Sequence, residues 1–300
     1  MAADEVKAYL RSRGEWQDEI AAGKMFGVLV VQERSGEVGF LAAFSGNLAG
    51  RNDHEYFVPA VYDMLQPDDF FRREEAEISA INGSVAKIQQ SSEYCKAKQN
   101  VQSCRLQGDV EIRELKQTLA LRKVERAQRR AAGEAEAQLI LESQRDNADL
   151  QRLKRHHRDA IAEAENHLAT FDAQLASLRE ERSRRSADLQ MALFREFRML
   201  NARGEVRDLC ELFAPTAQCI PPAGAGECAA PKMLQYAYLN GFKPLAMAEF
   251  WQGVSPRGEV RHDGYFYPSC NSKCKPILMH MMQGLDVEPN PLAEIAPPEP

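Results

Sequence analysis

The feature that most constrains this chain is the absence of proline from residues 70–200, although the 300 residues include 15 prolines. Proline breaks helices because it has no amide hydrogen and its ring collides with the preceding turn. The same segment is rich in Ala, Glu, Arg, Gln and Leu, which favour helix. We therefore predict that about 130 consecutive residues are helical.

Apolar residues in this segment recur at alternating spacings of three and four, which is typical of a coiled-coil seam. The pattern begins at Ile78, slips in phase near Gly108 and continues to Leu193. A break near the midpoint predicts two antiparallel helices with a tip near 131–144, each about 60 residues and roughly 90 Å long. The alternative is one uninterrupted helix that forms a homodimer through the same seam.

An antiparallel hairpin returns the chain to its starting point, so we expect the two flanking segments to meet. Two apolar runs, at 25–31 and 38–44, flank a turn that contains Gly36, and they predict a β-hairpin. The elements predicted after the helical segment are helices at 206–213, 229–240 and 275–283 and a strand at 244–251.

These elements define the predicted fold class and domain boundaries. The class is α+β: a small mixed α/β head built from both chain ends, with a long antiparallel α-helical coiled-coil hairpin inserted. The predicted boundaries are 1–68 for the first part of the head, 69–204 for the hairpin, 205–288 for the cysteine-bearing second part and 289–300 for a proline-rich linker.

Charge and hydropathy exclude several classes of protein. The net charge of −6 argues against a protein that coats nucleic acid, although residues 70–200 carry 24 basic and 21 acidic residues, a net +3. The mean hydropathy is −0.47, and the longest apolar run has seven residues, so we expect neither a membrane span nor a signal peptide. Seven cysteines without a secretory signal favour a reducing, cytoplasmic compartment.

Three cysteines and one histidine in the second part of the head have a pattern that suits zinc. Cys270 and Cys274 lie just before a predicted helix, Cys228 begins the helix about 42 residues earlier, and His262 lies eight residues before Cys270. Helix N-termini favour thiolates, and three Cys with His262 or a water molecule complete a tetrahedral shell. We therefore predict a structural Zn²⁺ site. The alternative is that the thiols pack as small apolar side chains.

The order of these elements also resembles that of zinc nucleobase deaminases. In those enzymes a metal ligand is followed two residues later by a catalytic glutamate, and Pro-Cys-x-x-Cys begins the next helix. Here Ala230 occupies the glutamate position, and the motif that starts at Pro268 has three residues between its cysteines. A deaminase-like zinc fold without the catalytic glutamate is therefore one alternative for the function.

The expected end of the hairpin is rich in positive charge, since residues 122–158 contain ten Lys or Arg, six Asp or Glu and no aromatic residue. Cations at similar heights on adjacent helices would form an end that contacts RNA phosphates without stacking on bases. The candidate RNA-binding residues are Arg122, Lys123, Arg126, Arg129, Arg130, Arg152, Lys154, Arg155 and Arg158. The alternative is a solvated coiled-coil surface with acid–base pairs.

Several short blocks outside the helical segment are distinctive. They are Gly23–Val30, Leu41–Leu48, Phe57–Pro59, Ile220–Lys232, Met247–Trp251 and Gly284–Pro291. Together they resemble the N-terminal region of a group of bacterial RluA-type RNA pseudouridine synthases. In that group a long helical hairpin separates the same two parts, and a synthase domain follows.

The resemblance implies an accessory region that positions structured RNA, rRNA or tRNA, for a tethered synthase domain that converts uridine to pseudouridine without a cofactor. The family's catalytic aspartate lies in a His-Arg-Leu-Asp motif. The nearest match, His157-Arg-Asp159, lacks the leucine and lies in the predicted coiled coil. We therefore assign no catalytic residue and expect this chain to end before the synthase domain and to be inactive alone. The alternative is a structural coiled-coil module for protein–protein contacts.

Overall fold

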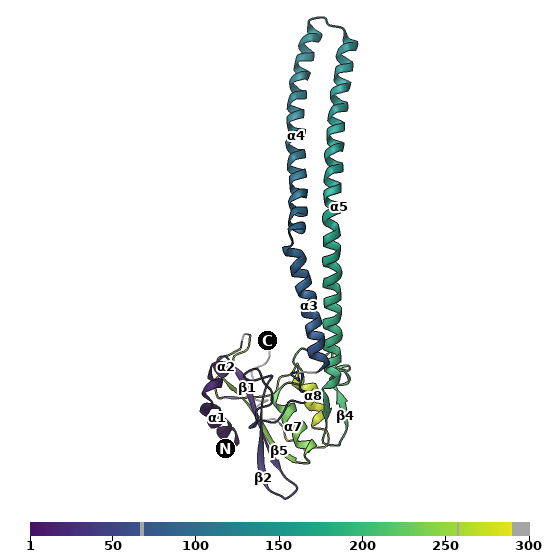
Figure 1. Cartoon of the computed structure of the whole chain (residues 1–300). Helices are drawn as coiled ribbons and strands as arrows, with labels where there is room; N and C mark the ends of the chain where they lie inside the picture. The colour runs from purple at the N-terminus through teal and green to yellow at the C-terminus, as the bar shows by residue number, and fades with distance from the viewer. Residues whose placement is uncertain (67–68, 257, 290–300) are drawn as a thin grey trace. The chain divides into compact units, whose positions relative to one another are not determined.

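The computed structural model describes residues 1–66, 69–256 and 258–289. The chain divides into two compact units. The head is Met1–Glu74 together with the described residues from Ala187 on, and the hairpin is Glu75–Ser186. The predicted fold class is confirmed, because an α/β head built from both chain ends contains an inserted antiparallel pair of long helices (Figure 1). From residue 290 on, the predicted linker lies outside the described residues.

The head contains a four-stranded antiparallel sheet with the strand order β2-β1-β5-β6. The predicted β-hairpin is present as β1 (Lys24–Gln32) and β2 (Val38–Phe44). The predicted later strand, β5 (Lys243–Gln252), pairs with the other edge of β1, and the short β6 (Phe266–Tyr267) pairs with β5. Because β1 lies between β2 and β5, it joins the N-terminal and C-terminal parts of the head.

Helices cover both faces of this sheet, and alternate residues of β1 face them. Phe26 and Val28 pack with the N-terminal helices, whereas Leu29 and Val31 pack with helices from the second part of the head. The N-terminal helices are α1 (Ala2–Ser12), the 3₁₀ helix η1 (Gly14–Trp16) and α2 (Gln17–Ala21). The helices on the other face are α6 (Leu209–Phe213), α7 (Ala229–Leu239) and α8 (Cys274–Met281).

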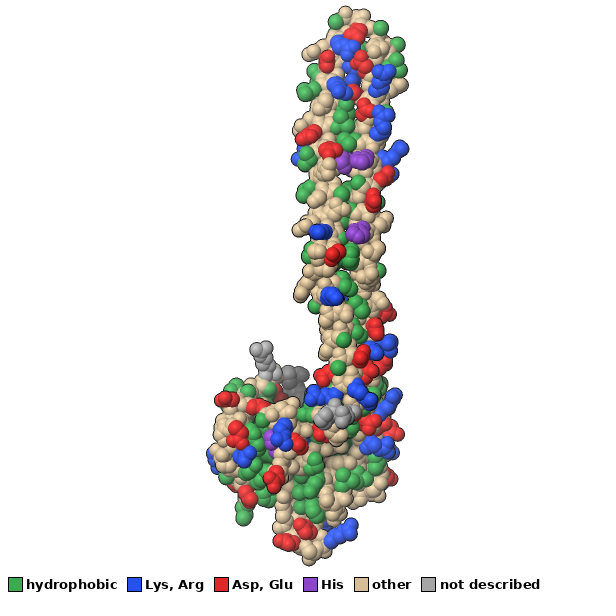
Figure 2. All heavy atoms as spheres, viewed as in Figure 1, with side chains coloured by type: hydrophobic (Ala, Val, Ile, Leu, Met, Phe, Trp, Pro, Cys, Tyr) green, Lys and Arg blue, Asp and Glu red, His purple; other side chains and the backbone are tan. Residues whose placement is uncertain are grey.

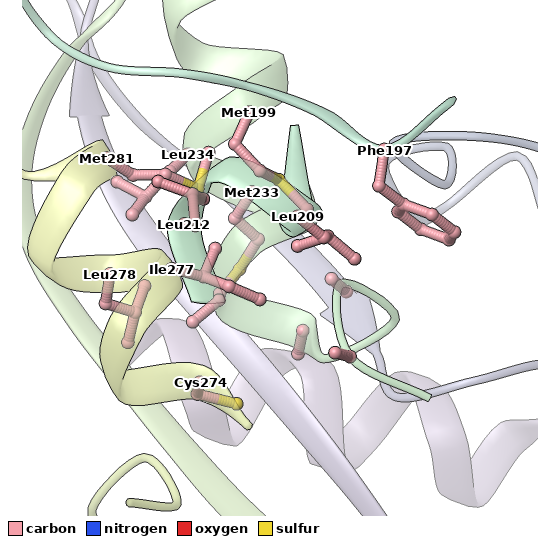
Figure 3. Close-up of a cluster of buried hydrophobic side chains, with 14 of the residues drawn as sticks. Phe197, Met199, Leu209, Leu212, Met233, Leu234, Cys274, Ile277, Leu278 and Met281 are labelled. Carbon is pink, nitrogen blue, oxygen red and sulfur yellow. The ribbon is translucent and has the colours of Figure 1, made fainter. Parts of the chain in front are cut away.

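The larger hydrophobic cluster lies on the α7 face (Figure 3). Met233 and Leu234 of α7 and Ile277 of α8 are almost completely buried there, together with Met199. Met199 belongs to β3 (Arg198–Leu200), which pairs with β4 (Val206–Asp208) in a separate two-stranded sheet. This cluster fixes the starting points of α7 and α8 relative to the sheet.

The predicted helix at 206–213 is only partly correct. Its first three residues form β4, and α6 begins after Asp208. The Asp208 carboxylate accepts the Glu211 N–H at 2.8 Å, and the Glu211 carboxylate accepts the Asp208 N–H at 3.0 Å. This capping box sets the start of the helix at residue 209.

The helical segment contains α3 (Phe70–Gln90), α4 (Ser92–Ala131) and α5 (Glu136–Glu196). The phase slip near Gly108 falls within α4, which is continuous through that residue. The first helix instead breaks at Ser91, whose Oγ accepts the Tyr94 N–H at 3.2 Å and caps α4. The turn occupies 132–135, where Gly133 has a φ of 86°. None of the described helices combines the length and apolar composition needed to cross a membrane.

Candidate functional site

The structure brings the three predicted cysteine ligands together. Cys228 is the N-cap of α7, Cys274 is the first residue of α8, and Cys270 lies in the loop before α8. The Sγ atoms of Cys270 and Cys274 are 3.4 Å apart, and the Cys228 thiol hydrogen-bonds to both. All three cysteines are free of disulfides, and Cys274 is buried. Two helix N-termini therefore converge on one group of thiols.

Hydrogen bonds concentrate negative charge on Cys270. The thiols of Cys228 and Cys274 lower the pKa of Cys270 to about 2, and the Cys274 N–H, 3.3 Å from its Sγ, adds to this effect. The hydrogen bond with Cys270 raises the pKa of Cys228 to about 12. Hydrogen bonds with Cys228, which has the larger effect, and with Cys270 raise the pKa of Cys274. These hydrogen bonds therefore favour the thiolate form at Cys270 over the thiolate forms of Cys228 and Cys274.

His262, the fourth predicted ligand, does not join this group. It is exposed; its backbone N–H donates to Tyr267 Oη at 2.6 Å, and its ring lies 5.5 Å from the Tyr265 ring. The Gly264 N–H donates to the Trp251 carbonyl at 2.7 Å, which holds this loop against the end of β5. Within the described residues, no group of three or more His, Cys, Asp or Glu is already spaced to hold a metal ion.

A buried carboxylate that the sequence analysis missed lies beside the thiols. Glu249 of β5 is only 6% exposed. Its Oε1 accepts the Ala230 N–H at 3.2 Å and its Oε2 accepts the Ser269 hydroxyl at 2.8 Å. Burial raises the pKa of this carboxyl. Its partners flank the thiols in sequence, since Ala230 follows Cys228 by two residues and Ser269 precedes Cys270.

Gly27 explains how α7 comes so near Glu249. The two residues are opposite each other in the β1–β5 register. A Cβ on Gly27 would lie 2.7 Å from Met233 Cε and 3.0 Å from Ala229 Cβ, both on α7. Only the lack of a side chain at this position lets the start of α7 approach the sheet closely. A detectable signal was present, because Glu249 is the sole charged residue in the predicted strand 244–251.

Lys232 is a second buried charged residue near the start of α7. Its Nζ donates to the carbonyl oxygens of Phe44 at 2.9 Å and Gly46 at 2.8 Å. Burial lowers the pKa of Lys232 to about 8. The side chain attaches α7 to the end of β2 and so helps to fix the position of Cys228.

On the hairpin, most of the candidate RNA-binding arginines contact acidic side chains of the hairpin itself. Red and blue side chains are accordingly mixed at its end (Figure 2). Asp146 accepts hydrogen bonds from Arg122 at 2.8 Å and from Arg126 at 2.5 Å. The other pairs are Arg129 with Glu134 and Glu142, Arg130 with Glu136, Arg152 with Asp149, and Arg158 with Asp159.

The remaining candidates, Lys123, Lys154 and Arg155, are exposed and have no acidic partner among the described residues. Lys154 and Arg158 line a hollow of about 460 Å³ between α4 and α5, together with Arg105 and His157. His157 itself is buried and its Nε2 lies 2.9 Å from Glu111 Oε2, which is a packing role within the helix pair. The accessible positive charge therefore follows α5 rather than the turn.

Comparison of the chain with models of protein families, with curated proteins and with solved structures finds no match.

Proposed function

We propose that this chain is an accessory region of an RNA pseudouridine synthase and that its hairpin positions structured RNA through phosphate contacts. The proposal rests on the sequence blocks that resemble RluA-type enzymes and on one surface of α5. On that surface Lys154 and Arg155 have no acidic partner among the described residues, and the first of them lines the hollow with Arg158. The synthase chemistry would belong to a tethered domain.

Ion pairing decides which cations contribute to binding. An arginine that already contacts a carboxylate must exchange that contact for a phosphate, whereas a free lysine gains one. Arg126 is buried against Asp146, so it stabilises the helix pair instead of contacting RNA. About three phosphate contacts are then expected, which gives weak, salt-sensitive binding without sequence preference.

The test compares two triple variants of the full chain. Lys154→Gln and Arg155→Gln remove the charges of the proposed surface that are unpaired in the described chain. Arg158→Gln removes a cation that lines the hollow with Lys154 and whose exposed contact with Asp159 can be exchanged for a phosphate. Affinity for a structured rRNA fragment is measured against salt concentration. The slope of log affinity against log salt should become shallower by roughly 0.7–0.9 for each phosphate that the variant no longer neutralises.

The control variant removes the same charge from exposed lysines elsewhere on α3 and α4, at Lys87, Lys96 and Lys116. It should retain most of the affinity and the slope of the parent chain. Equal decreases in affinity for the two variants would mean that only net charge matters. Unchanged binding in the α5 variant would contradict the proposal.

A second function is favoured by an apolar stripe on α4. Leu106, Val110, Leu121 and Val124 are 47–73% exposed, and their spacing places them on one face of the helix. Such a face suits a second copy of the hairpin, which would make the chain a structural coiled-coil module. Sedimentation equilibrium tests this: a dimer that Leu121→Gln dissociates supports the second function, and a monomer at all concentrations rejects it.

A further inference from the structure

We propose that Cys228, Cys270 and Cys274 bind one Zn²⁺ as thiolates and that a water molecule takes the fourth position, beside Glu249. The inference does not depend on RNA binding, since it concerns only the head. Of the two fourth ligands expected from the sequence, it selects water over His262, and it adds a carboxylate from β5 beside the metal.

The first step is the spacing of the sulfur atoms. Three thiolates at roughly 2.3 Å from a tetrahedral zinc lie about 3.8 Å from one another. Cys270 and Cys274 are 3.4 Å apart while they share a hydrogen bond, so the pair needs to open by only about 0.4 Å. In the described residues the three thiols are not already spaced for a metal ion, so this small opening has to accompany metal binding.

The second step is charge. Glu249 is a buried carboxyl group beside the thiols, and it forms no ion pair with Lys or Arg in the described chain. The Lys232 ammonium group donates to two backbone carbonyls and forms no ion pair with Glu249 among the described residues. Buried anions without a counter-ion are costly, and helix N-termini compensate only in part. A divalent cation that soft thiolate ligands prefer would neutralise the site.

The third step is the role of Glu249. Both of its oxygens already accept hydrogen bonds, from the Ala230 N–H and the Ser269 hydroxyl, which hold it beside the thiols rather than free to coordinate. Ala230 is the position at which zinc deaminases carry their glutamate. Strand β5 therefore places the Glu249 carboxylate next to Ala230, the position in α7 where those enzymes carry a glutamate.

The arrangement implies a specific proton transfer. Zinc lowers the pKa of a bound water towards neutrality. One proton of this water would pass to a Glu249 oxygen, so that the carboxylate becomes a neutral carboxyl and the water becomes a hydroxide. Such a centre has the parts needed to activate water for hydrolysis.

The metal experiment uses the full chain, purified without chelator. About one zinc per chain is expected, and Co²⁺ in its place should give tetrahedral and thiolate-charge-transfer absorption bands. Cys228→Ser and Cys270→Ser should each lower metal content at least tenfold, whereas Cys210→Ser, a half-buried thiol packed against the same core, should keep it. Circular dichroism checks that the variants are folded.

Glu249→Gln separates the proposed role from metal ligation. The variant should retain the metal but lose the pH-dependent change in the Co²⁺ spectrum that reports ionisation of the bound water. Glu227→Gln, a partly exposed glutamate in the loop before α7, should keep that change. Tenfold weaker metal binding in Glu249→Gln would show that Glu249 is itself a ligand. It would overturn the proposal that water holds the fourth position.

The wild-type protein alone can also overturn the proposal. Less than roughly a tenth of an equivalent of zinc, with no binding of added Zn²⁺ or Co²⁺ to the reduced protein, would leave the thiols as core packing. A Cys270–Cys274 disulfide in freshly isolated protein that excludes metal would do the same. RNA affinity measured on the same preparation shows whether the function proposed above survives independently.

Discussion

Lys232 and Glu249 are two charged side chains that the head buries, and neither forms an ion pair with the opposite charge among the described residues. Lys232 donates to two backbone carbonyls, and Glu249 accepts from one backbone N–H and one hydroxyl. Hydrogen bonds compensate for the water that each group gives up on burial. Lys232 belongs to the first turn of α7 and Glu249 lies against it, so the two residues fix the helix end that carries Cys228.

Lys232 should give the head a distinctive dependence of stability on pH. Its pKa is about 8 in the folded chain against 10.5 for an ordinary lysine, so unfolding takes up a proton between these values. The free energy of unfolding should therefore rise with pH from about 8 to 10.5, by at most about 3 kcal/mol. Denaturant unfolding of wild type and Lys232→Met across this range measures the difference.

Lys243→Met, at an exposed position at the start of β5, is the control and should follow the wild-type curve. The difference between the Lys232→Met and wild-type curves removes the contributions of cysteines and tyrosines that titrate in the same range. Parallel curves for Lys232→Met and wild type would show that this ammonium is not buried in solution.

The thiol site could be predicted from the sequence only in part. The positions of Cys228, Cys270 and Cys274 at helix starts followed from local pattern, and the structure brings them together. Glu249 was missed because its role depends on a long-range strand register that places it opposite Gly27. His262 was included on sequence distance alone, although the path of its loop leads elsewhere.

At the scale of elements, periodicity predicted the long helices better than their interruptions. The break at Ser91 comes from a single hydroxyl that caps the next helix, and no change in composition marks it. The helices α1 and α2 were missed, although Val6, Leu10 and Ile20 are buried against the sheet. Short helices carry few periodic positions, so their pattern is weak until the sheet they cover is known.

Two helical glycines offer a paired test of the hairpin. A Cβ on Gly83 in α3 meets nothing within 4 Å, whereas a Cβ on Gly108 in α4 lies 3.1 Å from the Cβ and Cγ of His157 on α5. Gly83→Ala should stabilise by about 0.5–1 kcal/mol, since alanine loses less entropy in a helix. Gly108→Ala should give no stabilisation or should destabilise, because the two helices must separate.

Thermal unfolding of the full chain, followed by helical circular dichroism, measures both changes. The Gly108→Ala, His157→Ala double variant is the internal control, since it removes the opposing ring and should recover part of the stability. Equal stabilisation by the two single alanine variants would show that α4 and α5 do not pack closely at Gly108.

At the scale of the whole molecule, each unit has its own source of stability. The head has two hydrophobic clusters, one on each face of its sheet. The hairpin relies on a narrow seam that includes Val101 and Leu175 and on ion pairs between its helices, such as Arg105 with Glu165 at 2.5 Å. The fold class was predictable from the sequence because prolines occur in the head segments and are absent from the helical segment. The ion pairs at the end of the hairpin were not predictable, since side-chain pairing between two helices depends on the register of the helices.

The last prediction is that the head folds without the hairpin. Residues 75–186 would be deleted, and Glu74 joined to Ala187 by a Gly/Ser linker of roughly six residues, enough to span the 8–10 Å between packed helix axes. Because both hydrophobic clusters remain, the shortened chain should be monomeric and show dispersed amide resonances. A smaller deletion, between the ion-paired Arg105 and Glu165, keeps the lower hairpin and serves as the control. If the smaller deletion folds and the complete one aggregates, the head requires the hairpin, and the two units are one cooperative structure.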